Sequence, residues 1–117
     1  KGELMLGLKI ENKRALANAE ASARVSGISF AEWGPGDMGM SLGHPDSHDP
    51  PYPLDMQAAR ARIKQACDAA GLSFLHGANP ENVVELIDDG IKIMGASRDG
   101  EETARRGREY TNRQMPV

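Results

Sequence analysis

The chain has 117 residues, of which 39% are hydrophobic, 4% aromatic and 26% charged, so it suits one small domain over 1–117 with an aliphatic core. Its net charge of −3 argues against a nucleic-acid partner, because a phosphate-binding surface usually carries a clustered basic excess. No apolar run approaches the roughly 20 residues that span a bilayer, and there is no signal-peptide pattern. We therefore expect a cytoplasmic protein without a membrane partner.

Strand and helix patterns alternate along the first half of the chain. A buried strand is predicted over Leu4–Glu11, and a helix that begins at a capping asparagine is predicted over 12–25. A second strand is predicted over Gly27–Gly34. The glycine- and proline-rich segment that follows, up to Pro53, is interpreted as a long loop. The part of it after Gly36 would also suit the start of a short helix.

The second half continues the alternation. The clearest helix covers 54–71, where apolar residues recur at three- and four-residue spacing and a glycine stands at the expected C-cap. The lone Cys67 falls on that apolar face and is interpreted as a small buried side chain. A strand over 72–78, a helix over 79–90 that Asn79 caps, a strand over 91–97 and a polar helix over 99–114 complete the pattern. The basic cluster at 104–109 is interleaved with acids, which indicates a solvated helix face.

Alternating strands and helices predict an α/β fold with a parallel sheet covered by helices. The apolar runs agree, because parallel strands are buried on both faces. A free-standing four-stranded Rossmann-like or flavodoxin-like sheet would satisfy the pattern, and so would half of an eight-stranded barrel of about 250 residues. Periodicity does not separate these two architectures.

Two carboxylates fall at the ends of neighbouring predicted strands. Glu11 ends the first strand, and Asp37 follows the second inside the glycine-rich segment. Such a pair suits a hard divalent cation such as Mg²⁺ or Mn²⁺, which accepts oxygen ligands and keeps positions for water and substrate. The alternative is structural: Glu11 would cap the next helix and Asp37 would accept hydrogen bonds from turn amides.

The glycines around Asp37 favour a ligand. Gly34, Gly36 and Gly39 let backbone approach a bound group without a Cβ atom in the way. Pro35 has no N–H, so Gly36 and Asp37 are the expected amide donors to an anion. Amides for an anion beside carboxylates for a metal suit a small acid that also chelates the metal, such as a 2-oxo acid.

These motifs resemble a known family. The segments "LKIENKRALANAE", "VSGISFAEWGPGDMGMSLGHP", "ANPENV" and "IMGASRDG" resemble the C-terminal half of the HpcH/HpaI aldolases, metal-dependent class II pyruvate aldolases related more distantly to the citrate lyase β-subunit. The resemblance covers nearly the whole chain. Its most specific part is the spacing from Glu11 to Asp37 together with "GPGDMGMSLGHP", where the family typically has Gly-Pro-Ala-Asp-Leu-Ser and then Ser-Leu-Gly.

The resemblance implies a TIM (β/α)8 barrel of which this chain supplies the last four β-α units. It implies that Glu11 and Asp37 bind Mg²⁺, Mn²⁺ or Co²⁺, and that Gly34, Gly36 and Asp37 hold the carboxylate of pyruvate or a similar 2-oxo acid. The implied reaction cleaves or forms 4-hydroxy-2-oxo acids, with an aldehyde as the second substrate, through a metal-stabilised pyruvate enolate. It also implies a homo-oligomer, a hexamer in the family, or association with the missing half.

The family's acid/base histidine and substrate-binding arginine lie in the first half of the barrel, so this chain alone is expected to be inactive and its catalytic residues are unknown. His44, His48 and His76 do not align with that histidine. With Asp46 and Asp49, the first two could bind a metal, but we favour a solvated proline-rich loop. For His76 we favour a satisfied core position over a barrel-lining one.

Lys9 departs from the family, which commonly has a substrate-contacting glutamine there. We expect Lys9 either to contact substrate or to pair with Glu32 on the neighbouring strand, because a mid-strand acid needs a partner. Two other functions stay open for the chain. One is a non-catalytic half-barrel module that binds a metal or anion, and the other is a citrate-lyase-like lyase that acts on a CoA thioester.

Overall fold

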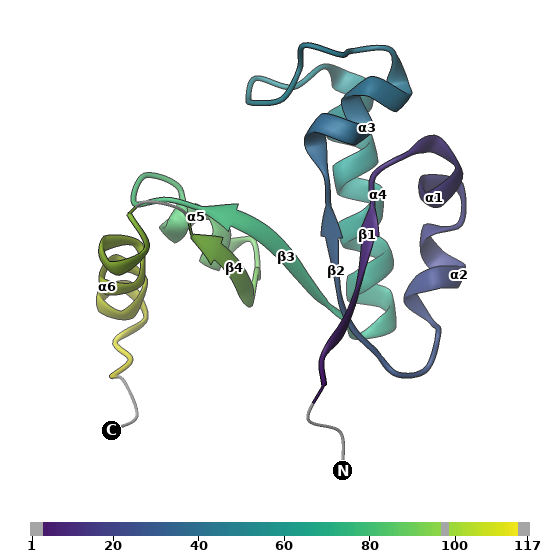
Figure 1. Ribbon diagram of the computed structural model, residues 1–117. Coiled ribbons are helices and arrows are strands. Elements are labelled where there is room, and N and C mark those ends of the chain that lie inside the picture. Colours follow the sequence, from purple (N-terminus) through teal and green to yellow (C-terminus); the bar gives the residue numbers. More distant parts are fainter. Residues whose placement is uncertain (1–3, 97–98, 115–117) are drawn as a thin grey trace. The chain divides into compact units, whose positions relative to one another are not determined.

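The structure of the chain is a computed structural model that describes residues 4–96 and 99–114 (Figure 1). The chain divides into two compact units, residues 1–74 and 75–117. Within the first unit β1 pairs with β2, and within the second β3 pairs with β4, both in parallel. This confirms the predicted α/β fold with parallel strands. The expectation of a single domain over 1–117 stays a prediction.

The first unit is built on strands β1 (Leu6–Ile10) and β2 (Ile28–Trp33). Lys9 lies opposite Glu32 and Ile10 lies opposite Trp33. Because strand side chains alternate between faces, these two pairs lie on opposite faces of the two strands. Ile10 and Trp33 are buried on one face, whereas Lys9 is exposed on the other. The polar face therefore carries the candidate site residues.

Two short helices, α1 (Lys13–Ala17) and α2 (Ala19–Ala23), replace the single helix predicted over 12–25. Asn12 caps α1 as expected, since its side chain accepts a hydrogen bond from the Ala15 amide at 2.9 Å. The break falls at Asn18, whose side-chain amide donates to the Arg14 carbonyl at 2.8 Å. Asparagine side chains compete in this way with the hydrogen bonds of the helix backbone, which explains why the helix breaks at this residue.

The segment predicted as a long loop begins with an eight-residue helix, α3 (Pro35–Leu42). Pro35 occupies the first helical position and Gly43 ends the helix with a φ of 98°, which are ordinary start and stop signals. The sequence allowed a short helix after Gly36, and the high glycine content favoured the loop as the main interpretation. Only the remainder, from His44 to Pro53, lacks regular structure.

The helix predicted over 54–71 is confirmed as α4 (Leu54–Ala70), closed by Gly71 with a φ of 69°. Cys67 is buried and free, as expected. Burial raises the pKa of its thiol. The helix places its apolar face in the core of the first unit, where it packs against β2 and against α1, α2 and α3. That face consists of Met56, Ala59, Ile63, Ala66 and Cys67.

The second unit contains most of β3 (Ser73–Ala78), together with α5 (Val83–Asp88), β4 (Ile93–Ala96) and α6 (Gly100–Thr111). Ser97, which the predicted fourth strand included, lies outside the described residues. The helix after β3 starts later than predicted, because Asn79 accepts from the amides of Glu81 and Asn82 and so forms a turn before α5. Within this unit α5 and α6 pack together.

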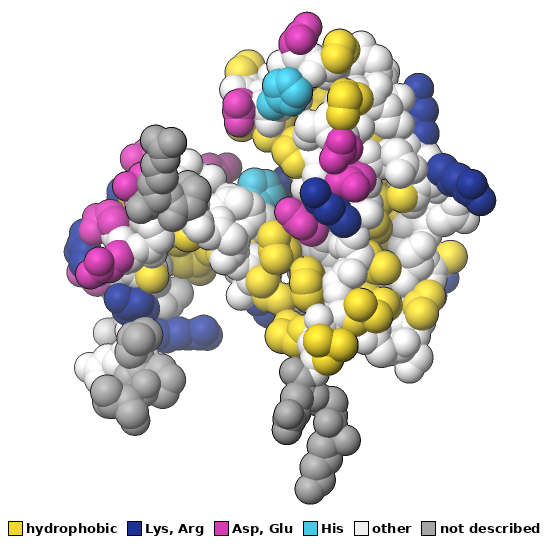
Figure 2. Space-filling view, in the orientation of Figure 1, with side chains coloured by type: hydrophobic (Ala, Val, Ile, Leu, Met, Phe, Trp, Pro, Cys, Tyr) yellow, Lys and Arg dark blue, Asp and Glu magenta, His cyan; other side chains and the backbone are white. Residues whose placement is uncertain are grey.

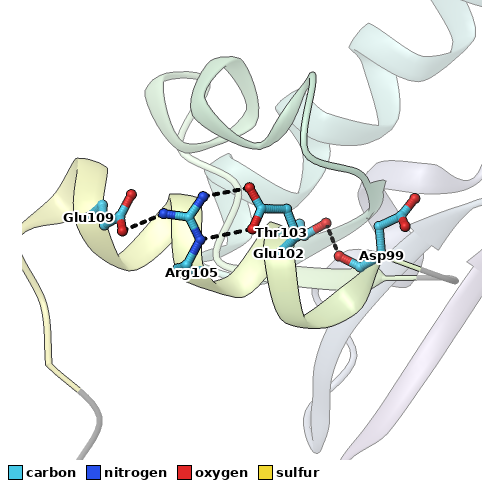
Figure 3. A network of polar contacts seen from close by, with 5 residues as sticks. All are labelled: Asp99, Glu102, Thr103, Arg105 and Glu109. Atoms are coloured by element: carbon cyan, nitrogen blue, oxygen red, sulfur yellow. Dashed lines mark hydrogen bonds and ion pairs between the residues drawn. The ribbon is translucent and has the colours of Figure 1, made fainter.

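The basic cluster of the C-terminal helix is the solvated face that its sequence indicates. In Figure 3, Arg105 donates to the carboxylates of Glu102 and Glu109, one turn away on either side along α6. The Thr103 hydroxyl donates to the Asp99 carbonyl at 2.8 Å at the start of the helix. The two carboxylates raise the pKa of Arg105. Within this cluster, the Arg105 guanidinium is thus paired with two carboxylates of its own helix.

Exposed apolar side chains gather where β1 begins. Leu4, Met5 and Leu6 are all more than half exposed, and Figure 2 shows yellow side chains near the lower end of the unit that holds β1 and β2. Among the described residues, no helix combines the length and the hydropathy needed to cross a bilayer.

Candidate metal and carboxylate site

The Glu11 carboxylate lies at the carboxyl end of β1 beside the Lys9 ammonium. Lys9 Nζ is 3.2 Å from Glu11 Oε2, and the two side chains are 52% and 29% exposed. The Oε2 atom itself is buried, and no group in the described part of the chain donates a hydrogen bond to it in acceptable geometry. Lys9 and Glu11 therefore form an ion pair, but the geometry is not that of a hydrogen bond from the ammonium to Oε2.

Gly34 makes the burial of that carboxylate possible. A Cβ atom on Gly34 would lie 2.6 Å from Glu11 Oε2, a distance that real Cβ atoms essentially never show, and at a tight 3.2 Å from Lys9 Cε. The sequence predicted that backbone at this glycine approaches a ligand. The structure gives a more direct reason for the glycine, because the Glu11 side chain occupies the space in front of it.

The amides expected to hold an anion stand in the first turn of α3. Gly34 is the N-cap, and the first N–H to bond within the helix is that of Met38, which donates to the Gly34 carbonyl at 3.0 Å. Pro35 has no N–H. The amides of Gly36 and Asp37 therefore have no acceptor among the described residues, and the helix start adds a partial positive charge.

Asp37 is exposed in that same first turn. Its charge reaches Lys9, whose pKa is raised first by its interaction with Glu11, then by the charge of Glu32, and further by that of Asp37. Three carboxylates thus act electrostatically on this one ammonium.

The donor set fits a hard divalent cation. Glu11 offers a buried oxygen with an unused lone pair, and Asp37 offers an exposed carboxylate one helical turn into α3. Mg²⁺ in proteins is often bound by one or two carboxylates while water and substrate complete its shell. Among the described residues, no group of three or more His, Cys, Asp or Glu side chains is arranged to hold a metal. Any ion at this site would therefore need water and substrate as further ligands.

The expected ion pair between Lys9 and Glu32 is wrong as stated. The two residues lie opposite each other on neighbouring strands, as predicted. The ammonium nevertheless pairs with Glu11, and no ion pair within 4 Å joins it to Glu32. Glu11 and Glu32 both share the face of Lys9. The ammonium lies beside Glu11, which follows Lys9 by two residues just beyond the end of β1.

The loop histidines differ in their surroundings. A Cβ on Gly36 would lie 3.4 Å from His48 Nδ1, so this imidazole borders the start of α3. Sequence reasoning missed that contact, because spacing gives no signal for a proline-rich loop that returns to its own beginning. His44 Nε2 is 2.9 Å from Asp55 Oδ2 and joins the loop to the start of α4. That hydrogen bond lowers the pKa of Asp55.

His76 shares a face of its strand with Ala78, which is buried, and lies opposite Met94 on β4. Its Nδ1 is 2.8 Å from the Gly77 carbonyl oxygen. Met94 and Ala96 border a groove of about 740 Å³ between β4, α5 and α6. The groove contains Lys92, Arg108 and Arg113 but no carboxylate, so it lacks the chemistry of the Glu11 site.

Comparison with known proteins gives consistent matches. The profile of the HpcH/HpaI aldolase/citrate lyase family matches residues 1–105. The chain is 40% identical over 94 residues to the hydroxypyruvate/pyruvate aldolase of Paraburkholderia phytofirmans, covering 79% of the chain and 35% of the relative. It is 33% identical over 93 residues to the 2-dehydro-3,6-dideoxy-6-sulfogluconate aldolase of Pseudomonas putida, with the same coverage of both proteins.

A solved structure supports the fold. The protein CitE of Mycobacterium tuberculosis, in complex with magnesium and acetate, superposes with a TM-score of 0.73 at 17% identity. The match covers 99% of this chain and 53% of that one. The four β-α units thus have the TIM-barrel-like α/β fold of these proteins, and the chain spans about a third of the length of the curated relatives it matches.

Proposed function

The chain belongs to the HpcH/HpaI aldolase/citrate lyase family, and on this basis we propose that it forms part of a carbon–carbon lyase that cleaves or forms 4-hydroxy-2-oxo acids. Two similar relatives are aldolases at 33% and 40% identity. That supports an aldolase over a lyase of CoA thioesters, since the CitE structure at 17% identity informs on the fold alone.

The observation that carries the proposal is the unsatisfied Oε2 atom of Glu11, which is enclosed beside Gly34. A buried carboxylate oxygen without a directed donor is costly. The Lys9 ammonium at 3.2 Å offsets its charge without donating to it in acceptable geometry, so a coordinating cation would complete the site. Glu11 and Asp37 would hold Mg²⁺, Mn²⁺ or Co²⁺, and such an ion would supply Lewis-acid polarisation of the substrate's 2-oxo group.

The start of α3 would bind the substrate carboxylate. Among the described residues, the amides of Gly36 and Asp37 have no acceptor, and at a helix start an anion is stabilised by hydrogen bonds and by the helix dipole. Gly34 makes room for the Glu11 carboxylate beside this helix start. The Lys9 ammonium on the same face would add positive charge for an anionic substrate.

Aldol cleavage breaks the bond between C3 and C4 of the substrate. The proton of the C4 hydroxyl passes to a base, and C3 of the released pyruvate takes up a proton. We assign neither transfer to a residue of this chain. They fit the histidine that the family resemblance places in the other half of the barrel.

A pyruvate-release assay on the whole protein tests the proposal. A panel of 4-hydroxy-2-oxo acids with Mg²⁺, Mn²⁺ or Co²⁺ should yield pyruvate and an aldehyde, and Asp37→Ala should reduce the rate by about a hundredfold or more. Undiminished cleavage in Asp37→Ala would rule out the metal assignment. Metal binding without pyruvate from any substrate would favour the non-catalytic module, and release of an acyl-CoA product would favour the thioester lyase.

A further inference from the structure

We propose that Lys9 competes with the divalent cation for Glu11, and that Glu32 receives the lysine ammonium when the cation binds. The inference rests on the metal site proposed above. It assigns a role to Glu32, which neither the metal site nor the anion site uses, and a second role to Lys9.

The competition follows from the position of Lys9. Its Nζ lies 3.2 Å from Glu11 Oε2, the oxygen whose lone pair is otherwise unused. Gly34 packs so closely against Oε2 that even a Cβ atom there would approach to 2.6 Å. With backbone on one side and the ammonium on another, a cation that binds Oε2 has to share it with Lys9 or displace Lys9.

Glu32 is placed to accept the displaced ammonium. It lies directly opposite Lys9 in the register of β1 and β2, and therefore on the same face. It is partly buried and makes no ion pair within 4 Å in the part of the chain that the structure describes. Lys9 is about half exposed, and its flexible stem can carry the ammonium across to the neighbouring strand.

The charges of the site favour this exchange. Glu11 contacts Lys9 and Glu32 lies opposite it in the register of the strands, and the charge of Asp37 also acts on the lysine. One ammonium together with one divalent cation neutralises three carboxylates, whereas the ammonium alone leaves the group strongly negative. A partly buried acid such as Glu32 is stabilised by a close partner, and the exchange gives it one.

The test measures Mn²⁺ affinity of the whole protein by electron paramagnetic resonance, independently of activity. Lys9→Met should tighten Mn²⁺ binding by roughly three- to tenfold, because it removes the competing cation. Glu32→Gln should weaken it by a similar factor, because the ammonium then stays on Glu11. In the Lys9→Met background, Glu32→Gln should have a much smaller effect, which a double-mutant cycle reports directly.

Arg24→Gln serves as the matched control. It removes one positive charge from the exposed end of α2, before β2 begins, and should leave Mn²⁺ affinity almost unchanged. A Lys9→Met variant that binds Mn²⁺ no more tightly than the parent would overturn the proposal, as would an equal effect of Glu32→Gln in both backgrounds.

Glu11→Gln separates this inference from the proposed function. If Glu11→Gln abolishes Mn²⁺ binding while Lys9→Met changes nothing, the metal site stands and only the competition is refuted. If Glu11→Gln leaves Mn²⁺ binding intact, the metal site itself is wrong and the competition fails with it.

Discussion

The backbone of Gly34 packs against the carboxylate of Glu11, so that a Cβ atom on the glycine would lie 2.6 Å from Oε2. Gly34 follows directly after β2, and Glu11 follows directly after β1. Parallel strands that lie side by side bring such following residues to the same edge. Gly34, at the end of β2, thus leaves space for the Glu11 carboxylate at the end of the neighbouring strand β1.

Gly34→Ala should therefore weaken metal binding. The added methyl group forces Glu11 out of its position. Changes that disturb the placement of a metal ligand typically lower the affinity of the protein for the metal by about 10- to 100-fold. Titration with Mn²⁺ measures the change. Gly100→Ala at the start of α6 is the control, because its Cβ would meet Ala96 at an ordinary 3.5 Å and no closer atom of the described residues. Equal Mn²⁺ affinity in Gly34→Ala and the parent protein would contradict this use of the glycine.

Gly7→Ala should destabilise the first unit through Phe30. The two residues lie opposite each other on β1 and β2, and a Cβ on Gly7 would overlap the Phe30 ring. Overpacking of this kind costs about 1–3 kcal/mol in the free energy of unfolding, which denaturant unfolding measures.

The partner substitution provides the control for that prediction. Phe30→Leu removes the obstructing ring, so Gly7→Ala should cost much less in the Phe30→Leu background than in the parent protein. Equal costs in both backgrounds would show that Phe30 is not the reason for the glycine.

The ion pair between Glu20 and Arg62 should make stability depend on acidic pH. Arg62 donates to both Glu20 oxygens, at 2.8 and 3.0 Å, and joins α4 to α2. These hydrogen bonds lower the pKa of Glu20 from 4.5 to about 2. A carboxylate whose folded pKa is depressed stabilises the protein above its unfolded pKa and loses that effect as pH falls through its folded pKa.

Glu20→Gln should accordingly lower the Tm at neutral pH, and the difference from the parent should close between about pH 4.5 and pH 2. Thermal unfolding at several pH values gives the comparison. Glu85→Gln, which changes an exposed carboxylate of α5, should show no such convergence. A Tm difference for Glu20→Gln that persists at pH 2 would mean that the charge of Glu20 is not its source.

The parts of the fold that follow from local rules were predictable. The sequence between Leu54 and Gly71 predicts both the apolar face of α4 and the αL conformation of Gly71 that ends it. Asn12 caps α1 for the same kind of local reason. The positions of Glu11 and Asp37 at neighbouring element ends follow from the alternation of strands and helices.

The parts that depend on a choice between partners were not predictable. The sequence places two carboxylates, Glu11 and Glu32, within reach of Lys9. Only the three-dimensional structure shows that the ammonium pairs with Glu11. Asn18 breaks a helix because its side chain reaches a carbonyl, whereas spacing alone permits the helix to continue. The proximity of His48 to Gly36 depends on the path of a proline-rich loop, which no periodicity encodes.

That loop has an internal reporter. Trp33, the only tryptophan of the chain, lies at the end of β2 and is 4% exposed. Its ring centroid is 5.0 Å from that of Tyr52 in an edge-on arrangement, with the planes at 76°. Tyr52 belongs to the loop, and its burial raises the pKa of its hydroxyl. Trp33 fluorescence should therefore report whether the loop is docked.

Tyr52→Ala should expose Trp33 to water and shift its emission to longer wavelength, because the aromatic contact that covers the indole is lost. The substitution should also cost about 1 kcal/mol or more in the free energy of unfolding, since such aromatic pairs contribute roughly 0.5–1.5 kcal/mol beyond their buried area. Tyr52→Phe keeps the ring and loses only the long hydroxyl contact to the His48 carbonyl, at 3.5 Å. Its emission should match that of the parent, and an equal shift in both variants would show that the hydroxyl, and not the ring, holds the loop against Trp33.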